Sequence, residues 1–401
     1  MNRRNFIRLA GGGTIAAASG STLVGCGAVG GHYPAEAVEA WNGPVGETDV
    51  RRRAVAYAIT APNPHNLQPW LVDLRERDVI TLRTDRERVL PHTDPQGRQI
   101  LIGHGAFLEL LVMALAQQGV ASDVLLWPQG ELPSALAAWD DRPVARITLK
   151  PGGTPDPLFA QVLLRRTPKT DFDTSRAVAP ELLAQLLGGA QANAQVGAQA
   201  SAPLNMGGTV HPDQLPALRT LCWESAKVEL LTPRTMMESI HLTRVGPGEI
   251  LQHRDGISLN SPFVRAVSAL GMFDRSAPPA EGSAAYKSAM GRFEGHSRTA
   301  MGFVWITGPN TRNDQVHTGR RYVRQQLQAT ALGVGMHPMS QALQEFAEMA
   351  PHYERVHQLV LGRPAPRSAS DPTVQMFCRI GYPQGEVPAT PRRPLAKMLL
   401  T

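Results

Sequence analysis

The chain has 401 residues, 42% of them hydrophobic and 18% charged, with a formal net charge of +6. This length and composition predict a globular protein with a large core and two or three domains. Lysine occurs only at positions 150, 169, 227, 287 and 397, so arginine carries nearly all of the positive charge. The arginines are scattered singly and in pairs without interleaved aromatic residues, which argues against a nucleic-acid partner. An arginine-biased composition together with an anionic small ligand explains the charge better.

Three cysteines are too few for a disulfide framework. Cys222 lies in a helical pattern and Cys378 in an apolar, strand-like run, where a free cysteine usually packs as a small buried residue. We expect neither to be catalytic, and a disulfide between the two stays open for an oxidising compartment. The sequence contains no cysteine and histidine spacing typical of a metal site.

The N-terminus has the features of an export signal. Arg3 and Arg4 precede a weakly hydrophobic stretch over residues 9–24 that is rich in glycine and alanine, and this pattern resembles a twin-arginine signal. The alternative, an amphipathic first helix, is disfavoured because the glycines at 11–13 would interrupt it. The stretch is also too short and glycine-rich for a membrane span.

The run Leu23-Val24-Gly25-Cys26 then resembles a bacterial lipobox, in which the cysteine thiol receives a lipid. We therefore expect residues 1–25 to be a signal and residues 26–44 a flexible tether. The mature protein would be a membrane-anchored lipoprotein on the periplasmic side. Because the twin-arginine route carries proteins that are already folded, often around a cofactor, the signal also favours a bound cofactor.

Hydrophobic periodicity and turn residues predict the elements that follow. Up to residue 150 we expect a helix from an N-cap at Thr48 to Thr60, strands over 70–75 and 79–84, a helix over 98–118, and strands over 123–127 and 144–149. After a proline- and glycine-rich break at 151–155 we expect helices near 157–166 and over 181–187, 214–230 and 319–332, with strands over 302–307 and 374–382. The span of about 233–294 is rich in glycine, proline and serine, so we expect a long insertion that could act as a lid.

The loop 61–70 contains Asn-Leu-Gln-Pro-Trp, and residues 165–172 read Arg-Arg-Thr-Pro-Lys-Thr-Asp-Phe and continue into 178–183. These segments resemble motifs of the FMN-binding nitroreductase-like family. The C-terminal part resembles the family's closing third over residues 327–333, 380–383 and 392–395. The order of the motifs, the export signal and the phrase at 94–98 together resemble the Acg-type branch. The resemblance covers most of residues 45–400, but hardly the insertion.

The resemblance implies an α+β fold with two related halves in one chain, an internal pseudo-dimer of small sheets flanked by helices. The halves would span residues 45–150 and 155–401, with the flavin between them and the lid at about 233–294. The first half keeps only the Asn-Leu-Gln-Pro-Trp loop and the second keeps only the arginine motifs. We therefore expect a monomer with one complete flavin site.

The resemblance also implies which residues hold FMN. Arginine suits the doubly charged phosphate, which Arg165 would bind together with Thr167 and with Arg392 or Arg393; Arg166 and Lys169 lie nearby in the sequence. Without the resemblance, Arg165 and Arg166 could simply cap the preceding helix. The flavin ring and ribityl chain would contact Pro62, Asn63, Pro64 and Asn66, and the backbone of Met336, His337 and Pro338 would face the ring.

No catalytic residue is assigned, because in such proteins the cofactor carries the redox chemistry. His337 could supply a proton, but a single histidine is more often structural, and we expect the histidines at 92, 104, 296 and 317 to be ordinary. The leading hypothesis is an exported FMN-dependent oxidoreductase that reduces an unidentified acceptor. The alternative is a lipoprotein that binds FMN without turnover, because soluble nicotinamide donors are scarce outside the cytoplasm. A scaffold with a degenerate site would leave the arginine pairs unexplained.

Overall fold

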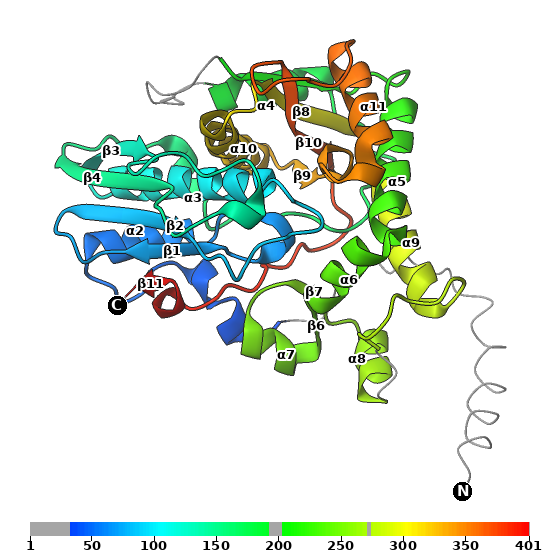
Figure 1. Ribbon diagram of the computed structural model, residues 1–401, viewed down its shortest axis with the longest axis horizontal. Helices are drawn as coiled ribbons and strands as arrows, with labels where there is room; N and C mark the ends of the chain where they lie inside the picture. Colours follow the sequence, from blue (N-terminus) through cyan, green and yellow to red (C-terminus); the bar gives the residue numbers. More distant parts are fainter. Residues whose placement is uncertain (1–32, 192–202, 271–273, 401) are drawn as a thin grey trace, which may run out of the picture.

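The computed structural model describes residues 33–191, 203–270 and 274–400. Arg3, Arg4 and Cys26, on which the predicted export and lipidation depend, lie outside the described residues. Two sheets dominate the fold, a five-stranded sheet in the order β11-β1-β2-β4-β3 and a four-stranded sheet in the order β5-β8-β10-β9 (Figure 1). The prediction of an α+β fold with small sheets flanked by helices is confirmed.

The first sheet and its helices come from the N-terminal part of the chain. Its strands are β1 (Trp70–Asp73), β2 (Val79–Thr84), β3 (Val120–Leu126) and β4 (Ala145–Pro151), and its helices are α2 (Val50–Ala58) and α3 (Arg98–Ala116). The side chain of Asp49 caps α2 by accepting hydrogen bonds from the backbone of Arg51 and Arg52. Apolar side chains of both helices and of β1, β2 and β4 share one buried core. Among the described residues α3 alone has the length and hydropathy of a membrane span, and 83% of its apolar window is buried within the protein.

The second sheet is covered on both faces. Its strands are β5 (Asn205–Thr209), β8 (Gly302–Gly308), β9 (Gly335–Pro338) and β10 (Thr373–Gly381). Alternate residues of β8 and β10 point to opposite faces: Val304 and Cys378 join the core beneath α4 (Pro180–Gln191) and α10 (Arg312–Ala331), while Phe303 and Phe377 join the core beneath α5 (Leu215–Leu231) and α11 (Ala350–Leu361). The sheet is therefore the middle layer of a helix–sheet–helix sandwich.

Helices α3 and α10 cross at two glycines and join the halves. A Cβ atom on Gly105 would lie 1.9 Å from the carbonyl oxygen of Val316, and one on Gly319 would lie 1.9 Å from the carbonyl oxygen of Ile102. The contact is reciprocal, because each glycine faces the residue three positions before the other glycine. Only glycine allows two helix backbones to approach this closely.

The C-terminus also links the halves. After β10 the chain runs back to the first sheet, where β11 (Leu399–Leu400) pairs in parallel with β1, with Val72 opposite Leu399. This places the last residues beside the N-terminal half (Figure 1). The segment that leads to β11 contains Arg392 and Arg393, so strand pairing at its end carries these arginines to the first half.

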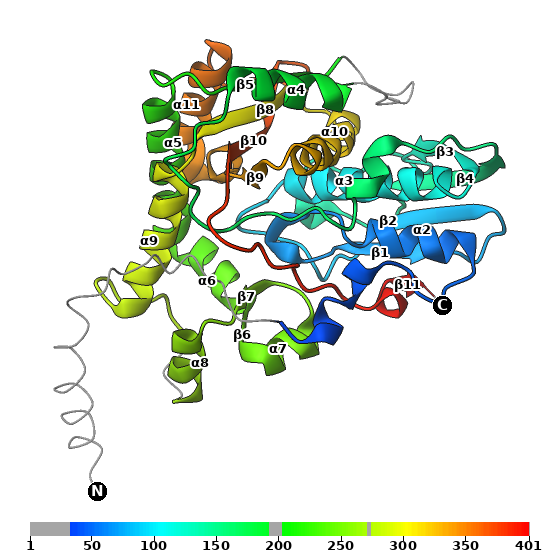
Figure 2. The same cartoon turned by 180° about the vertical axis from the view of Figure 1, so that it is seen from behind.

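Most of the central segment forms a group of short elements below the two sheets, while its last helix lies beside α5 (Figure 2). It contains α6 (Pro233–His241), β6 (Thr243–Val245), α7 (Gly246–His253), β7 (Ile257–Leu259), α8 (Pro262–Ala269) and α9 (Ala284–Arg298). The group is attached to the first half, since Asp255 pairs with Arg88 at 2.5 Å and the Gly256 amide donates to the carbonyl oxygen of Asn66 at 3.2 Å. Its role as a lid stays a prediction.

Several local expectations differ from the structure. The N-cap of α2 is Asp49 rather than Thr48, because the Asp49 side chain accepts hydrogen bonds from the free backbone N–H groups. The helix expected near 157–166 is a short 3₁₀ turn, Pro157–Gln161, and α10 begins at Arg312 because Thr311 and Asp314 form a capping box there. Strands β5, β6, β7, β9 and β11 were not predicted, because all are short and β5 contains two glycines. Residues 35–42, expected within a flexible tether, form 3₁₀ turns and bury Trp41.

The glycine crossing gives a stability prediction. Gly105→Ala would force the Val316 carbonyl and the whole α10 backbone to shift, so we expect a loss of about 1–3 kcal/mol in the free energy of unfolding. Gly188→Ala is the matched control: it lies within α4 with no atom within 4 Å of its Cβ position, and should gain up to about 1 kcal/mol from helix propensity. Urea unfolding of both variants checks this. Equal stability of Gly105→Ala and the parent would show that the crossing is not close-packed.

Candidate functional site

The loop between α2 and β1 has a strained backbone. His65, Asn66 and Gln68 have left-handed φ angles of 48°, 54° and 55°, each of which costs on the order of 1 kcal/mol for a residue with a side chain. Hydrogen bonds hold this shape: Asn63 Oδ1 accepts from the Gln68 amide at 2.7 Å, and Gln68 Nε2 donates to the carbonyl oxygens of Asn66 and Arg254 at 3.2 and 2.9 Å. The amides of Asn63 and Asn66, predicted to contact a flavin, thus already shape the loop.

The loop packs directly on α3, and Pro62 and Pro64 lie in its first part. A Cβ atom on Gly103 would lie 3.3 Å from Asn63 Cβ and 3.5 Å from Pro64 Cδ. Pro62 and Pro64 are half-buried. The position of the loop is therefore fixed by the same helix that crosses α10.

Three arginines from distant parts of the chain meet around Trp41. The guanidinium carbons of Arg166, Arg392 and Arg165 lie 4.5, 5.1 and 5.3 Å from the indole centroid. Arg165 and Arg392 both donate to the carbonyl oxygen of Thr60, at 2.8 and 2.9 Å. Burial, and next to it the charge of Arg166, lowers the pKa of Arg165 to about 10. Within the described part of the chain, no carboxylate lies within ion-pair distance of these three arginines.

The two C-terminal arginines have different surroundings. Arg392 fastens the loop, because it donates to the carbonyl oxygen of Ile59 and to Asn66 Oδ1, both at 2.8 Å. Arg393 turns instead to Asp85, at 3.6 Å, and to the carbonyl oxygens of Gln68 and Lys397. Of the predicted pair, only Arg392 joins Arg165.

The adjacent residues Arg165 and Arg166 make different contacts. Arg166 donates to the carbonyl oxygens of Leu163 and Arg165, as expected of a residue that caps the preceding turn. Arg165 reaches across to the first half at Thr60, and also donates to Gln326 Oε1 at 2.9 Å and Thr167 Oγ1 at 3.2 Å. Gln326 in turn donates to the carbonyl oxygen of Met336 at 3.4 Å. The structure therefore brings the 165–169 segment, β9 and the loop together.

Lys169 and Arg292 form the charged part of a cluster with unbalanced positive charge. The Lys169 side chain is exposed to solvent, yet the protein around it desolvates the ammonium and, with the charges of Arg292 and Arg392, lowers its pKa to about 8. Burial also lowers the pKa of Arg292 on α9. Neither cation has an ion pair with a described residue. We call Lys169, Arg292, His65, His296 and His337 the cationic cluster.

Two of its histidines are neutral and structurally engaged. His337 Nδ1 accepts from Arg379 Nε at 3.0 Å, and its ring lies edge-on to His296 with centroids 5.1 Å apart. His296 Nε2 is 3.0 Å from the carbonyl oxygen of Lys169. Burial, followed by the charge of Arg379, holds the pKa of both well below the usual value. His337 is consequently a poor proton source at neutral pH, and His296, expected to be ordinary, belongs to the cationic cluster.

A buried carboxyl group lies beside the cationic cluster. Glu229 on α5 accepts a hydrogen bond from Gln344 Nε2 at 2.8 Å through Oε2, while Oε1 lies 4.0 Å from His65 Nε2. Its side chain is only 6% exposed. Burial, aided by the nearby charge of Glu238, raises its pKa to about 7. The sequence offered no motif around Glu229, so pattern reasoning missed it.

Other residues of the site were also missed. Trp41 lay in the expected tether, Arg292 in the expected lid, and Gln326 directly before the family-like segment 327–333. Arg379 lay in a strand assigned only to the core. Each reaches the site only through tertiary contacts.

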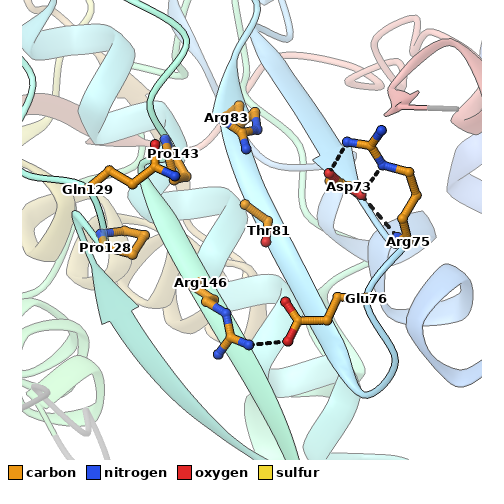
Figure 3. A pocket seen from close by; sticks show the side chains of 9 residues that line it. All are labelled: Asp73, Arg75, Glu76, Thr81, Arg83, Pro128, Gln129, Pro143 and Arg146. Atoms are coloured by element: carbon orange, nitrogen blue, oxygen red, sulfur yellow. Dashed lines mark hydrogen bonds and ion pairs between the residues drawn. The ribbon is translucent and has the colours of Figure 1, made fainter.

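A surface hollow on the first sheet contains paired charges (Figure 3). There Arg75 pairs with Asp73 at 2.6 Å and Arg146 pairs with Glu76. The hollow contains none of the predicted site residues. Cys222 and Cys378 are buried free thiols whose pKa values burial raises, so the disulfide left open by the sequence is not formed in this structure.

Glu229 gives a pH prediction. Its pKa is raised from 4.5 to about 7, so the stability that its proton contributes is complete below pH 4.5 and is lost as the pH rises through 7. Glu229→Gln keeps the hydrogen bond without the charge, and should be more stable than the parent at pH 8 but not at pH 5, by at most about 3 kcal/mol. Glu224→Gln, an exposed change on the same helix, should show no such trend. Urea unfolding at both pH values checks this; parallel curves for Glu229→Gln and the parent would contradict it.

Comparison with known proteins gives partial matches. No protein-family model matches the chain. Over 125 residues, 31% of the chain, it is 37% identical to a Mycobacterium tuberculosis protein named "Putative NAD(P)H nitroreductase acg". Over 126 residues it is 32% identical to an uncharacterised protein of the same organism. The chain spans 36% of the length of each of these relatives.

A solved nitroreductase-like family protein from Bacillus cereus aligns with 62% of the chain and 97% of its own length, with a TM-score of 0.33 and 13% identity. The sequence matches support a relationship of the chain to nitroreductase-like proteins.

Proposed function

We propose that the protein is an exported FMN-dependent oxidoreductase of the nitroreductase type that reduces an acceptor through its bound flavin. The observation that carries the proposal is the set of cations without carboxylate partners that lines the site. Arg165, Arg166, Arg392, Lys169 and Arg292 repel one another, and the charges of several of them lower their neighbours' pKa values. A protein keeps such an arrangement where an anionic ligand balances it.

The residues present fit the phosphate of FMN. Arg165 Nε is buried and has no partner among the described residues, so one charge-assisted donor is left over. The Thr167 hydroxyl is 3.2 Å from Arg165 Nη1, and Arg166 stacks on Trp41 at the same place. These groups would hold the phosphate, and Lys169 in the cationic cluster would offset further negative charge of the ligand. The bound flavin would supply the electron transfer, while the protein binds and orients it.

The strained loop and β9 would form the walls beside the ring. Pro62, Asn63, Pro64 and Asn66 come from the first half, and Met336, His337 and Pro338 from the second. Because each half contributes different parts, we infer one flavin site per chain and a monomer. The central segment, which is bonded to Asn66 and Gln68 through Gly256 and Arg254, would limit access to the flavin.

A binding protein without turnover is the alternative. It would use the same phosphate contacts, and the proposed export favours it because soluble nicotinamide donors are scarce outside the cytoplasm. Reduction of the bound flavin by a physiological donor, followed by its reoxidation by an acceptor, supports the oxidoreductase. Flavin that stays oxidised with every donor supports the binding protein.

The flavin proposal predicts one FMN per chain. Arg165→Ala removes a charge-assisted donor and should weaken FMN binding by about 1.5–3 kcal/mol, or one to two decades in affinity. Riboflavin, which lacks the phosphate, should bind both proteins equally. Arg146→Ala, which removes the same charge at the surface hollow, is the control and should change neither affinity. Fluorescence titration measures all three.

The stoichiometry is measured by absorbance against protein mass, beside light scattering. Two flavins per chain, or unchanged FMN affinity in Arg165→Ala, would show that the site is assigned wrongly. Asn66→Ala should weaken the binding of both FMN and riboflavin, because it removes the hydrogen bond from Arg392 to Asn66 Oδ1 that holds the loop. If Asn66→Ala weakened the binding of FMN but not of riboflavin, Asn66 would instead contribute to phosphate binding.

The N-terminal sequence predicts separate steps of export and lipidation. Arg3→Lys combined with Arg4→Lys should leave the precursor in the cytoplasm, because the twin-arginine route reads this pair. Cys26→Ala should release exported protein from the membrane, since it removes the lipid acceptor. Cell fractionation and immunoblotting follow both variants. Mature, membrane-associated protein in both would contradict the proposed route.

A further inference from the structure

Helix α8 of the central segment carries an exposed apolar face. Phe263 is 63% exposed and Leu270, the C-cap residue, is 67% exposed, and Ala266 between them is exposed too. The spacing of three and four residues puts these side chains on one side of the helix. We call Phe263, Ala266 and Leu270 the apolar face of α8. Exposed apolar side chains that gather in one place are typical of surfaces that contact a partner or a membrane.

The apolar face is the outer side of the helix. In both views α8 projects from the lower part of the molecule, away from the two sheets (Figure 1, Figure 2). Arg265 lies on the side of the helix opposite to Phe263, and its Cγ atom is 3.7 Å from the position of a Cβ atom on Gly246, the first residue of α7. The side with Arg265 therefore packs towards the protein, and the apolar face is left open to solvent.

The sequence around α8 carries no negative charge. Residues 256–273 contain one charged residue, Arg265, and no carboxylate, whereas 18% of the whole chain is charged. A surface of anionic phospholipids repels carboxylates and attracts arginine, and it accepts apolar side chains such as those of phenylalanine and leucine. The composition of this stretch suits such a surface.

The N-terminal segment enters the described structure beside α8. The side chain of Tyr33, the first described residue, lies against that of Ser258 on β7, three residues before the N-cap of α8. Glu39 pairs with Arg254 at 2.7 Å, which attaches the same segment to the end of α7. The seven steps from Cys26 to Tyr33 span at most about 25 Å. A lipid on Cys26 would therefore keep the side of the protein that carries α8 close to the bilayer.

We propose that the apolar face of α8 inserts into the surface of the phospholipid bilayer that holds the lipid on Cys26. The inference rests on the proposed export and lipidation, and it goes beyond the proposed reaction. A bilayer is the occupant that we infer because the chain would bring its own lipid to this side of the molecule. Phe263 and Leu270 would leave water there, while the guanidinium group of Arg265 would stay among the head groups.

The helix and the lipid would form two attachment points, so the protein would keep one orientation on the membrane instead of turning freely on its tether. The helix alone would not hold the protein there. Two side chains bury less apolar surface than a myristoyl chain, which by itself binds a membrane only marginally. Cys26→Ala is therefore still expected to release the protein.

The test measures whether α8 meets lipid in the full-length, lipidated chain. Phe263→Cys is labelled with the environment-sensitive fluorophore NBD, which the buried thiols of Cys222 and Cys378 and a lipidated Cys26 leave to the new cysteine. The protein is reconstituted into vesicles of phosphatidylethanolamine and phosphatidylglycerol. We expect the NBD emission to increase and shift to shorter wavelength, and to be quenched by lipids with a nitroxide on the acyl chain. Leu125→Cys, 47% exposed on the edge strand β3, is the control and should show neither change.

Two further measurements identify the other outcomes. Mass spectrometry establishes whether the purified chain carries a lipid, and light scattering of soluble Cys26→Ala protein, with and without Phe263→Ser, tests for a second copy on the apolar face. Lipidated protein whose label at 263 behaves like the control overturns the inference, while the proposed lipidation stands. A dimer that Phe263→Ser dissociates would also overturn it, because the face would then bind a second copy. A chain without lipid overturns the proposed lipidation and the inference together.

Discussion

The crossing of α3 and α10 at Gly105 and Gly319 is the contact on which the rest of the structure depends. The two helix backbones are in direct contact. Close packing of this kind leaves little room for one half to move relative to the other. The strained loop packs on Gly103 of α3, and Gln326 on α10 bonds Arg165. The loop and the arginine motif therefore meet because the helices that carry or support them cross so closely.

Some arginines in the interior form ion pairs with carboxylates, and others have only neutral acceptors. Near the crossing, Arg320 and Arg324 share the carboxylate of Glu109 at 2.7 and 2.9 Å, and Arg324 also pairs with Asp156. That network balances its own charge and lowers the pKa of Glu109. The guanidinium groups around Trp41 receive only carbonyl, amide and hydroxyl acceptors. Stability alone would favour carboxylate partners there too, since an uncompensated buried charge is costly, so the difference supports the ligand site that we propose.

The central segment stabilises the strained backbone of the loop between α2 and β1. Left-handed angles at His65, Asn66 and Gln68 persist only if surrounding groups determine them. Arg254 accepts a hydrogen bond from Gln68 through its carbonyl oxygen, and the Gly256 amide donates to Asn66. The C-terminal segment adds Arg392 on the other side. The same contacts that fix the backbone also place His65 opposite Glu229.

The sequence by itself predicted the long helix expected at 98–118, most of the strands, the α+β class and the resemblance to nitroreductase-like proteins, because periodicity and short motifs are local properties of the chain. It also identified the segments at 62–66, 165–169 and 336–338 that the fold brings together. Local patterns could not show that Arg392 rather than Arg393 faces Arg165, since adjacent residues in an extended segment point to opposite sides. Local patterns also could not show that Trp41, Arg292 and Glu229 lie near the site. Trp41 was expected in the tether, Arg292 in the lid, and Glu229 in a helix without a motif. Only the tertiary structure decided these, because burial and charge pairing depend on neighbours that are more than a hundred residues away in the chain.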